Sequence, residues 1–234
     1  MIKLDHLIYC FDNLKMQFDF QVNKAERIVI LGPSGAGKST LLSLMAGFKY
    51  PTRESIFLNG QNHTRSSPSK RPLSILFQEN NLFSHLTVWQ NIALGIAPNL
   101  RLDHYQHAQV KQMLEKVFLE DFFNRFPSQM SGGQRQRVAL ARCLIRQKPI
   151  LLLDEPFAVF DPALRHEILG LLKQVCDERQ LTLLMISHNL EDSMQIATRF
   201  IVIAGGQIVY DGDPDRLMNG LIPESTLLGI PSRC

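Results

Sequence analysis

The sequence predicts an α/β fold, a layered sheet covered by helices, and three patterns support this class. A glycine-rich loop at residues 32–39 separates a short apolar run from a helix-like stretch. The apolar runs at 150–153 and 182–186 flank a helical pattern at 163–179. Residues 88–126 show helical spacing, which predicts a mostly helical subdomain. Alternation of strands and helices in this order is typical of a layered α/β core.

The first third of the chain consists of short apolar runs bounded by turn residues. A turn is expected at Asn59-Gly60, and an exposed loop at 62–72, where Ser, Pro and basic residues gather. The predicted elements of this part are strands at 4–11, 16–22, 27–31 and 56–58 and a helix at 38–47.

The remaining elements continue the alternation, with a strand at 74–77 before the helical subdomain and a helix that begins near Ser131. The tail at 217–234 is weakly periodic and is expected to be partly disordered. The predicted buried face of the helical subdomain carries Val110, Leu114, Val117 and Phe118. The last predicted element is a hairpin of strands 200–203 and 208–210 around Gly205-Gly206.

Composition excludes several classes of protein. Of the 234 residues, 45% are hydrophobic and 20% charged, the balance of a soluble globular domain. The net charge of +3, without a block of Lys or Arg, gives no reason to expect nucleic-acid binding. No secretory signal is expected, and every apolar run is far shorter than the roughly 20 residues that span a bilayer. Work at a membrane would therefore require a partner.

The spacing of the cysteines matches neither a metal site nor a disulfide framework. These residues are Cys10, Cys143, Cys176 and Cys234, and their spacing favours a reducing, cytoplasmic setting.

The segment Gly32-Pro33-Ser34-Gly35-Ala36-Gly37-Lys38-Ser39 has the spacing and context of a phosphate cradle. Glycines let backbone N–H groups approach a phosphate, and the following helix adds positive partial charge. We expect Lys38 to neutralise the β- and γ-phosphates, Ser39 to ligate Mg²⁺ and Thr40 to lie near the α-phosphate. The alternative is a chance glycine-rich turn before a core helix, which the rest of the chain disfavours.

Two carboxylates, Asp154 and Glu155, end the apolar run at 150–153. This order is expected for an acid that orients Mg²⁺ followed by a base that polarises water. Many strands end in acidic residues, so the pair alone is weak evidence for a catalytic site. Beside the phosphate loop it is strong evidence. Together they predict ATP binding and hydrolysis with Mg²⁺.

The segment Met130-Ser131-Gly132-Gly133-Gln134 resembles the signature motif of ATP-binding cassette (ABC) transporter ATPases. Taken alone, it would more often be a plain helix N-cap. However, Gln78, Asp161 and His188 stand in the order and spacing of that family's Q-loop, D-loop and switch histidine. The resemblance implies a P-loop NTPase cassette with a RecA-like core, an N-terminal antiparallel β part and a helical signature subdomain.

The same resemblance implies how the chain is divided and how it assembles. A single domain, 1–234, would hold the core and β part at about 1–77 and 145–234, and the Q-loop and helical subdomain at about 78–144. Two subunits would meet head to tail, so that the phosphate loop of one and the signature motif of the other enclose each ATP. We therefore expect a homodimer with two nucleotide sites.

Residue roles also follow from the resemblance. Glu155 would act as the general base, His188 would contact the γ-phosphate, and Gln78 would sense the γ-phosphate or metal and relay to a membrane subunit. Asp161 would touch the opposite protomer. The implied metal ligands are Ser39, Gln78 and Asp154. The implied nucleotide contacts are Phe11, Gly32, Pro33, Ser34, Gly35, Ala36, Gly37, Lys38, Ser39, Thr40, Ser131, Gly132, Gly133, Gln134 and Asp161.

Some positions leave alternatives open. Phe11 stands where an aromatic residue stacks on adenine in the family, Tyr9 is its rival, and either could instead belong to the core. Met130 replaces the usual Leu, a swap that conserves volume. Val159-Phe160 replaces the expected Ala-Leu before Asp161 and would add bulk at a dimer contact.

Within the family, residues 76–88, 139–144 and 161–165 resemble the ATPases of bacterial thiamine importers. This implies an integral membrane permease as partner, a periplasmic solute-binding protein as indirect partner, and a peripheral place on the cytoplasmic face of the inner membrane. Phe83, Leu86 and Trp89 could contact the permease or pack inside the helical subdomain.

Two other functions compete with this interpretation. A soluble cassette ATPase that acts on nucleic acid or the ribosome usually carries long insertions or a second cassette, and neither these nor a basic stripe is found. A nucleotide-binding scaffold without turnover is disfavoured because Glu155 and His188 are both present.

Overall fold

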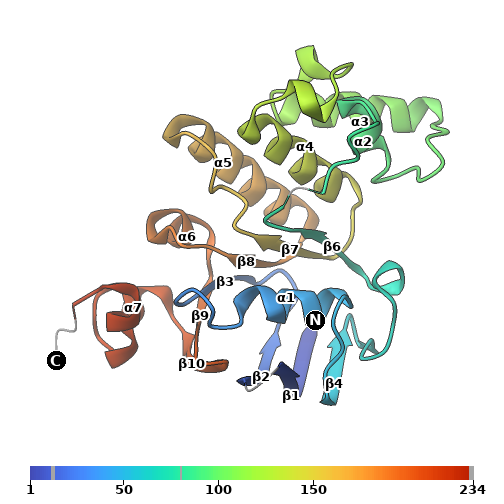
Figure 1. Ribbon diagram of the computed structural model, residues 1–234. Coiled ribbons are helices and arrows are strands. Elements are labelled where there is room, and N and C mark those ends of the chain that lie inside the picture. The colour runs from blue at the N-terminus through green and yellow to red at the C-terminus, as the bar shows by residue number, and fades with distance from the viewer. Residues whose placement is uncertain (12–13, 80, 232–234) are drawn as a thin grey trace.

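A computed structural model of the chain describes residues 1–11, 14–79 and 81–231. Its strands form one ten-stranded sheet in the order β5-β4-β1-β2-β10-β9-β3-β8-β7-β6. Figure 1 shows α1 on one side of the central strands, and α2 to α5 on the other side. Among the described residues, no helix combines the length and the apolar character that crossing a membrane demands.

The bounds of the elements are as follows. The strands are β1 (Ile2–Phe11), β2 (Leu14–Val22), β3 (Arg27–Leu31), β4 (Arg53–Leu58), β5 (Gln61–Asn62), β6 (Leu73–Leu76), β7 (Ile150–Asp154), β8 (Thr182–Ile186), β9 (Arg199–Ala204) and β10 (Gln207–Gly212). The α-helices are α1 (Lys38–Ala46), α2 (Val88–Ala93), α3 (His104–Lys116), α4 (Gly132–Ile145), α5 (Pro162–Arg179), α6 (Leu190–Ile196) and α7 (Pro214–Met218). The 3₁₀ helices are η1 (Pro68–Lys70), η2 (Glu120–Phe122), η3 (Pro127–Gln129) and η4 (Pro223–Leu228).

The centre of the sheet is parallel, with β3 paired to β8 and β9, and β7 paired to β6 and β8. Its strands are runs of Ile, Leu and Val because both faces are covered by helices. Successive residues of β3 point to opposite faces of the sheet. Ile28 and Ile30 belong to the core cluster that includes α1, whereas Val29 and Leu31 belong to the cluster that includes α4 and α5.

The antiparallel part, in which β1 pairs with β2 and β4, joins the parallel centre through β10. The β2–β10 pairing is a single parallel register point, Gln17 opposite Gln207. Gly206 reinforces this junction because its carbonyl accepts from the Gln17 N–H at 2.8 Å and its N–H donates to the Ala36 carbonyl at 3.2 Å. Its φ of 78° places it in the left-handed region that favours glycine.

The helical part begins each of its longer elements with a side-chain cap. Thr87, Asp103 and Ser131 precede α2, α3 and α4, and each forms a capping box with the Gln three residues later. The helices pack through a core cluster that α4 shares with the sheet. The expectation of helices across 88–126 is confirmed for α2 and α3.

Two expectations are wrong, one about the burial of Phe118 and one about disorder in the tail. Phe118 does not extend the buried face of α3, because the helix ends at Lys116 and Phe118 has a φ of 55° and is 45% exposed. The tail is ordered through α7 and η4, where the buried Ser225 hydroxyl donates to the Leu217 carbonyl at 2.7 Å. The rest of that expectation at 232–234, like Asn80, lies outside the described residues.

Smaller differences concern boundaries. The strand expected at 56–58 begins at Arg53, and the loop expected at 62–72 contains the end of β5 and the turn η1. The hairpin around Gly205-Gly206 is confirmed, since β9 and β10 pair antiparallel on either side of it.

A buried cation closes the carboxyl end of α1. Arg71 is fully buried, and its Nη1 donates to the carbonyls of Leu44 at 2.8 Å and Met45 at 2.7 Å. A positive charge is favourable here because the last carbonyls of a helix have no partner within the helix and carry negative partial charge. Burial lowers the pKa of the Arg71 guanidinium. Arg71 therefore anchors the helix that follows the phosphate loop.

We predict that Arg71→Met lowers the free energy of unfolding by about 3 kcal/mol, because two carbonyls of α1 lose a charged donor inside the core. Urea unfolding followed by circular dichroism measures this change. The matched control is Lys70→Ala, which removes an exposed cation one residue earlier. Equal stability of the two variants would contradict the anchoring role.

Candidate functional site

The predicted site residues follow the carboxyl ends of parallel strands. Gly32 follows β3, Asp154 ends β7, and His188 lies two residues beyond β8. Gln78 is exposed two residues beyond β6. Since these strands are neighbours in one parallel sheet, their ends meet at one edge, where α/β proteins bind ligands.

The phosphate loop requires glycine at two of its positions. Gly32 has a φ of 137°, and a Cβ there would lie 2.0 Å from the Ile203 carbonyl oxygen, so any side chain would collide with β9. Gly37 has a φ of 104° and caps α1, leaving the first N–H groups of the helix available. Pro33, Ser34 and Gly35 are exposed. The loop has the features of an anion-binding helix N-terminus.

Lys38 holds this loop from inside. Its ammonium is buried and donates to the carbonyls of Gly32 at 2.7 Å and Pro33 at 2.9 Å. A lysine has three donors, so one N–H remains for a phosphate oxygen. Burial lowers the pKa of Lys38, while the charges of Glu155 and Asp154 raise it. The two carboxylates thus favour a charged ammonium in a buried place.

Asp154 is buried beside Ser39. Burial raises the pKa of its carboxyl group, the hydrogen bond to Ser39 opposes this, and Glu155 adds to it. Its Oδ1 is buried without a hydrogen-bond partner among the described residues. An unpaired carboxylate oxygen next to a hydroxyl is a donor set that suits Mg²⁺, which commonly binds one or two carboxylates together with phosphates.

No group of three or more His, Cys, Asp or Glu that could hold a metal is found in the part of the chain that the structure describes. The donors expected for Mg²⁺ here are of another kind. They combine one carboxylate with the hydroxyl of Ser39 and the amide of Gln78. Ser39 is exposed and Thr40 half-buried on the first turn of α1.

Glu155 and His188 are in direct contact. The His188 Nε2 and Glu155 Oε1 atoms are 2.7 Å apart, and the two residues line a cavity of 270 Å³. Glu155 has a φ of 50°, an uncommon conformation for a residue with a Cβ, and its N–H donates to the Ile186 carbonyl at 3.1 Å. Strain of this kind is common at functional sites.

The signature segment forms a capped helix start. The Ser131 hydroxyl accepts from the Gln134 N–H at 3.2 Å, and Gln134 Oε1 accepts from the Ser131 N–H at 2.8 Å. Helices α4 and α1 belong to core clusters on opposite faces of the sheet. One chain therefore does not bring Ser131 to its own phosphate loop, which leaves this helix start free to face another molecule.

The turn before α5 differs in one respect from expectation. Asp161 caps α5 and accepts from the Leu164 N–H at 3.0 Å. Val159 is 56% exposed, whereas Phe160 is buried, and a Cβ at Gly133 would lie 3.5 Å from its ring. The expectation that Val159-Phe160 adds bulk at a dimer contact is therefore wrong for Phe160, which packs within its own chain. Met130 is buried in the core cluster of α4.

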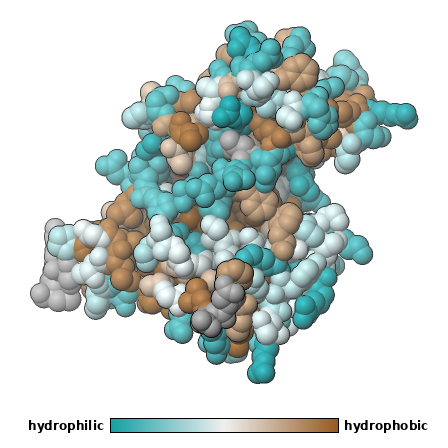
Figure 2. All heavy atoms as spheres, viewed as in Figure 1, coloured by the Kyte–Doolittle hydropathy of each residue, from teal (hydrophilic) through white to brown (hydrophobic). Residues whose placement is uncertain are grey.

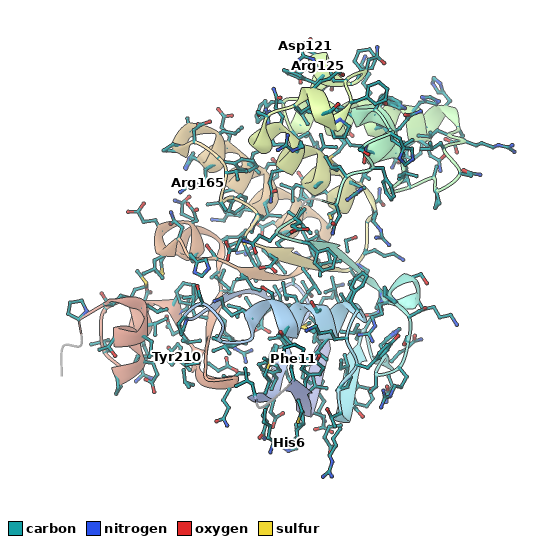
Figure 3. The ribbon with its side chains drawn as sticks, viewed as in Figure 1. His6, Phe11, Asp121, Arg125, Arg165 and Tyr210 are labelled. Atoms are coloured by element: carbon teal, nitrogen blue, oxygen red, sulfur yellow. The ribbon has the colours of Figure 1, made fainter. Side chains whose placement is uncertain are left out.

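Phe11 and Tyr9 have different surroundings. Phe11, labelled in Figure 3, is 55% exposed, while Tyr9 is half-buried against the core cluster that includes α1. The Lys49 ammonium lies over both rings, 5.1 Å from the Phe11 centroid and 5.3 Å from the Tyr9 centroid. The exposed ring of Phe11 is the better stacking surface for a base, and its contact with adenine stays a prediction.

Nothing in the sequence singles out two further residues beside the Glu155–His188 pair. Arg165 and Asp192 line the same cavity, with Arg165 Nε 3.7 Å from Asp192 Oδ2. Arg165 comes from α5 and Asp192 from α6, so only the folded chain brings them together.

Comparison with known proteins identifies relatives over nearly the whole chain. The chain is 59% identical over 230 residues to the thiamine import ATP-binding protein ThiQ of Photorhabdus laumondii, covering 98% of both proteins. It is 56% identical to the protein of that name from Yersinia pestis, covering 99% of this chain and 98% of the relative. The protein of the same name from Salmonella typhimurium is 52% identical, with 99% of each chain covered.

Solved structures agree with this result. A dimeric ATP-binding cassette, MJ0796, in a post-hydrolysis state bound to ADP and Pi, is 28% identical with a TM-score of 0.82, covering 92% of this chain and 99% of its own. The ADP conformation of another cassette, MJ1267, shares the fold, with a TM-score of 0.85 and 22% identity over 98% of each chain. A family model described as ABC transporter matches residues 16–158. The chain belongs to the ABC transporter family.

Proposed function

We propose that this chain is the ATP-hydrolysing subunit of an importer for thiamine or its phosphates. The cargo rests on the relatives named above, each of which carries the name of a thiamine import ATP-binding protein. The chemistry rests on one observation, the contact of Glu155 with His188 at the strand edge that carries the phosphate loop. Cargo choice would belong to the permease and a periplasmic binding protein, since this chain would never touch the solute.

In the proposed reaction, the loop at 32–39 binds the phosphates through its N–H groups, and Lys38 supplies a positive charge. Ser39, Asp154 and Gln78 would hold Mg²⁺, which when bound neutralises charge on the phosphate oxygens. Phe11 would stack on the adenine. The donors expected for the metal are all oxygen atoms, in keeping with the unpaired Oδ1 of Asp154.

Glu155 accepts a proton from the attacking water in this proposal, and His188 orients Glu155 through their 2.7 Å contact. The side chain of Glu155 is only partly exposed, whereas that of His188 is about half exposed. His188 is therefore accessible to a γ-phosphate while it holds the carboxylate. In this arrangement, Glu155 as the base and His188 as the group that would contact phosphate follow the ends of adjacent strands.

The second half of each nucleotide site would come from another copy of the chain. Ser131, Gly132, Gly133 and Gln134 form a helix start suited to an anion, but α4 lies across the sheet from α1. A head-to-tail homodimer would bring this start to the partner's phosphate loop, with Asp161 at the same interface. The solved cassette MJ0796 is dimeric, which supports a dimer of this chain.

The permease contact is proposed for the helical part. Figure 2 shows apolar residues among hydrophilic ones over this part, at the top of the view. A cavity of 230 Å³ is lined by Trp89, Leu114 and Phe123 together with the charged residues Lys111, Glu115 and Glu120. The Trp89 ring stacks on that of His107, with the ring centroids 5.5 Å apart. Phe83 is exposed and Leu86 half-buried nearby in sequence. Such a surface would receive a permease helix and hold the subunit at the cytoplasmic face of the inner membrane.

We predict that Lys38→Ala weakens ATP binding by roughly 30-fold, because the phosphates lose a charged donor and the loop loses its internal bonds. Titration with a fluorescent ATP analogue measures the dissociation constant. Lys173→Ala, which removes an exposed cation on α5, should leave it unchanged. An unaltered affinity of Lys38→Ala would refute the role of Lys38.

We predict that Glu155→Gln lowers kcat for ATP hydrolysis by at least about 100-fold, because the amide cannot accept the proton of water. ATP binding and ATP-driven dimerisation should persist, since the phosphate loop is unchanged. Steady-state phosphate release and size-exclusion chromatography measure the two properties. Glu178→Gln on α5 is the control, and full activity of Glu155→Gln would exclude Glu155 as the base.

The proposed function as a whole is tested by reconstitution with a thiamine importer's permease and binding protein in liposomes. ATPase activity should rise when thiamine-loaded binding protein is added. Trp89→Ala should reduce the ratio of stimulated to basal rate, because the cavity loses the larger of the aromatic side chains Trp89 and Phe123. Tyr105→Ala, an exposed aromatic on α3, should keep that ratio.

Stimulation by an unrelated solute alone would displace thiamine as the cargo. Co-purification with ribosomes or DNA, without a membrane partner, would favour the alternative function of a soluble ABC ATPase.

A further inference from the structure

Arg165 contacts both the turn that follows Glu155 and the helix that follows His188. Its Nη2 donates to the Phe160 carbonyl at 3.1 Å, in the turn that follows Glu155. Its Nε faces Asp192 Oδ2 at 3.7 Å, on the helix that follows His188. Figure 3 labels Arg165 on α5, near α6, and all these residues but Phe160 line the 270 Å³ cavity.

The turn from Glu155 to Phe160 is internally bonded. The Ala158 N–H donates to the Glu155 carbonyl at 3.4 Å, and the Phe160 N–H donates to the Phe157 carbonyl at 3.2 Å. The Phe160 ring is buried, with its centroid 6.2 Å from that of Phe157. A donor that fixes the Phe160 carbonyl therefore fixes the far end of the turn that begins at Glu155.

The segment after His188 is bonded just as closely. Asn189 caps α6, accepting from the Asp192 N–H at 2.9 Å on its side chain and from the Ser193 hydroxyl at 2.6 Å on its carbonyl. Its own N–H donates to the Ser187 hydroxyl at 3.1 Å. His188 sits between these bonded neighbours, so a shift of Asp192 would be transmitted to His188.

The Arg165–Asp192 pair is partly buried, with 26% of the Arg165 side chain and 10% of the Asp192 side chain exposed. Asp192 is buried, and burial raises the pKa of its carboxyl group, while the charge of Arg165 opposes the rise. Arg165 Nε is buried without a hydrogen-bond partner among the described residues. The opposite charges of the Asp192 carboxylate and the Arg165 guanidinium attract each other in this part-buried place and favour contact between the two side chains.

We propose that Arg165 is a positioning residue for ATP hydrolysis, which holds the Glu155 turn and the His188 segment in register through Phe160 and Asp192. The inference rests on the roles proposed for Glu155 and His188. Arg165 acts through them and contacts neither the phosphates nor the water. A lysine could not replace it, because only a guanidinium presents Nε and Nη2 donors in one rigid plane.

Arg165→Met tests this role. It should lower kcat for ATP hydrolysis about tenfold or more, because small misplacements of a catalytic group are costly, while KM for ATP changes by less than about twofold. Arg165→Lys should recover little of the loss. The matched control is Arg179→Met, which removes an Arg on the same helix whose Nη1 donates to the Leu144 carbonyl at 2.8 Å. It should keep kcat within about twofold of the parent.

Asp192→Asn gives a second test that preserves side-chain volume. It should lower kcat as well, and combining it with Arg165→Met should cost no more than Arg165→Met alone, since both break one link. An unchanged kcat in Arg165→Met, an equal loss in Arg179→Met, or additive losses in the double variant would overturn the inference. If Glu155→Gln remains fully active, the base assignment fails instead, so the two failures are distinguishable.

Discussion

The meeting of parallel strand ends at one edge of the sheet is the constraint on which the site depends. Strands β3, β8, β7 and β6 are adjacent and parallel, so their carboxyl ends point the same way. The phosphate loop, the Asp154–Glu155 pair, His188 and Gln78 each follow one of these ends. Residues separated by as many as 156 positions become neighbours because the strands pair, and the apolar faces of those strands provide the rigidity that the loops lack.

Charged side chains gather at this edge of the sheet, and some of them are buried. The Lys38 ammonium, the Asp154 carboxylate and the Glu155 carboxylate influence one another, and burial disfavours the charged forms of Lys38 and Asp154. A phosphate would bring negative charge to Lys38, and a divalent cation would bring positive charge to Asp154. In the proposed function, a nucleotide bound together with a divalent cation would supply both of these charges at once. Glu155, with its positive φ, adds backbone strain at the residue proposed as the base.

Patterns in short stretches of sequence predicted the features that depend on neighbouring residues, such as buried strands and helix caps. The buried parallel strands appear in the sequence as unbroken apolar runs, and the cap at Ser131 follows from a serine placed before a glutamine and an apolar run. Phe118 was misplaced because helical periodicity continued past the end of α3. The tail has no repeating pattern in the sequence. Its order comes from the bond of Ser225 to Leu217, from backbone bonds such as Ile230 to Ser225, and from the packing of Leu217 and Leu228 in the core. The contacts of Arg165 lie beyond any such pattern, since Asp192 belongs to another helix.

Gly206 joins the phosphate loop to the antiparallel strands with the two ends of its backbone. Its N–H bonds the Ala36 carbonyl of the loop, and its carbonyl bonds the N–H of Gln17 on β2, beside the single register point between the two halves of the sheet. A nucleotide held by the loop at its phosphates and by Phe11 at its base would span the same junction from outside. It would add a further tie between the antiparallel strands and the parallel centre, which already share one core cluster with α1.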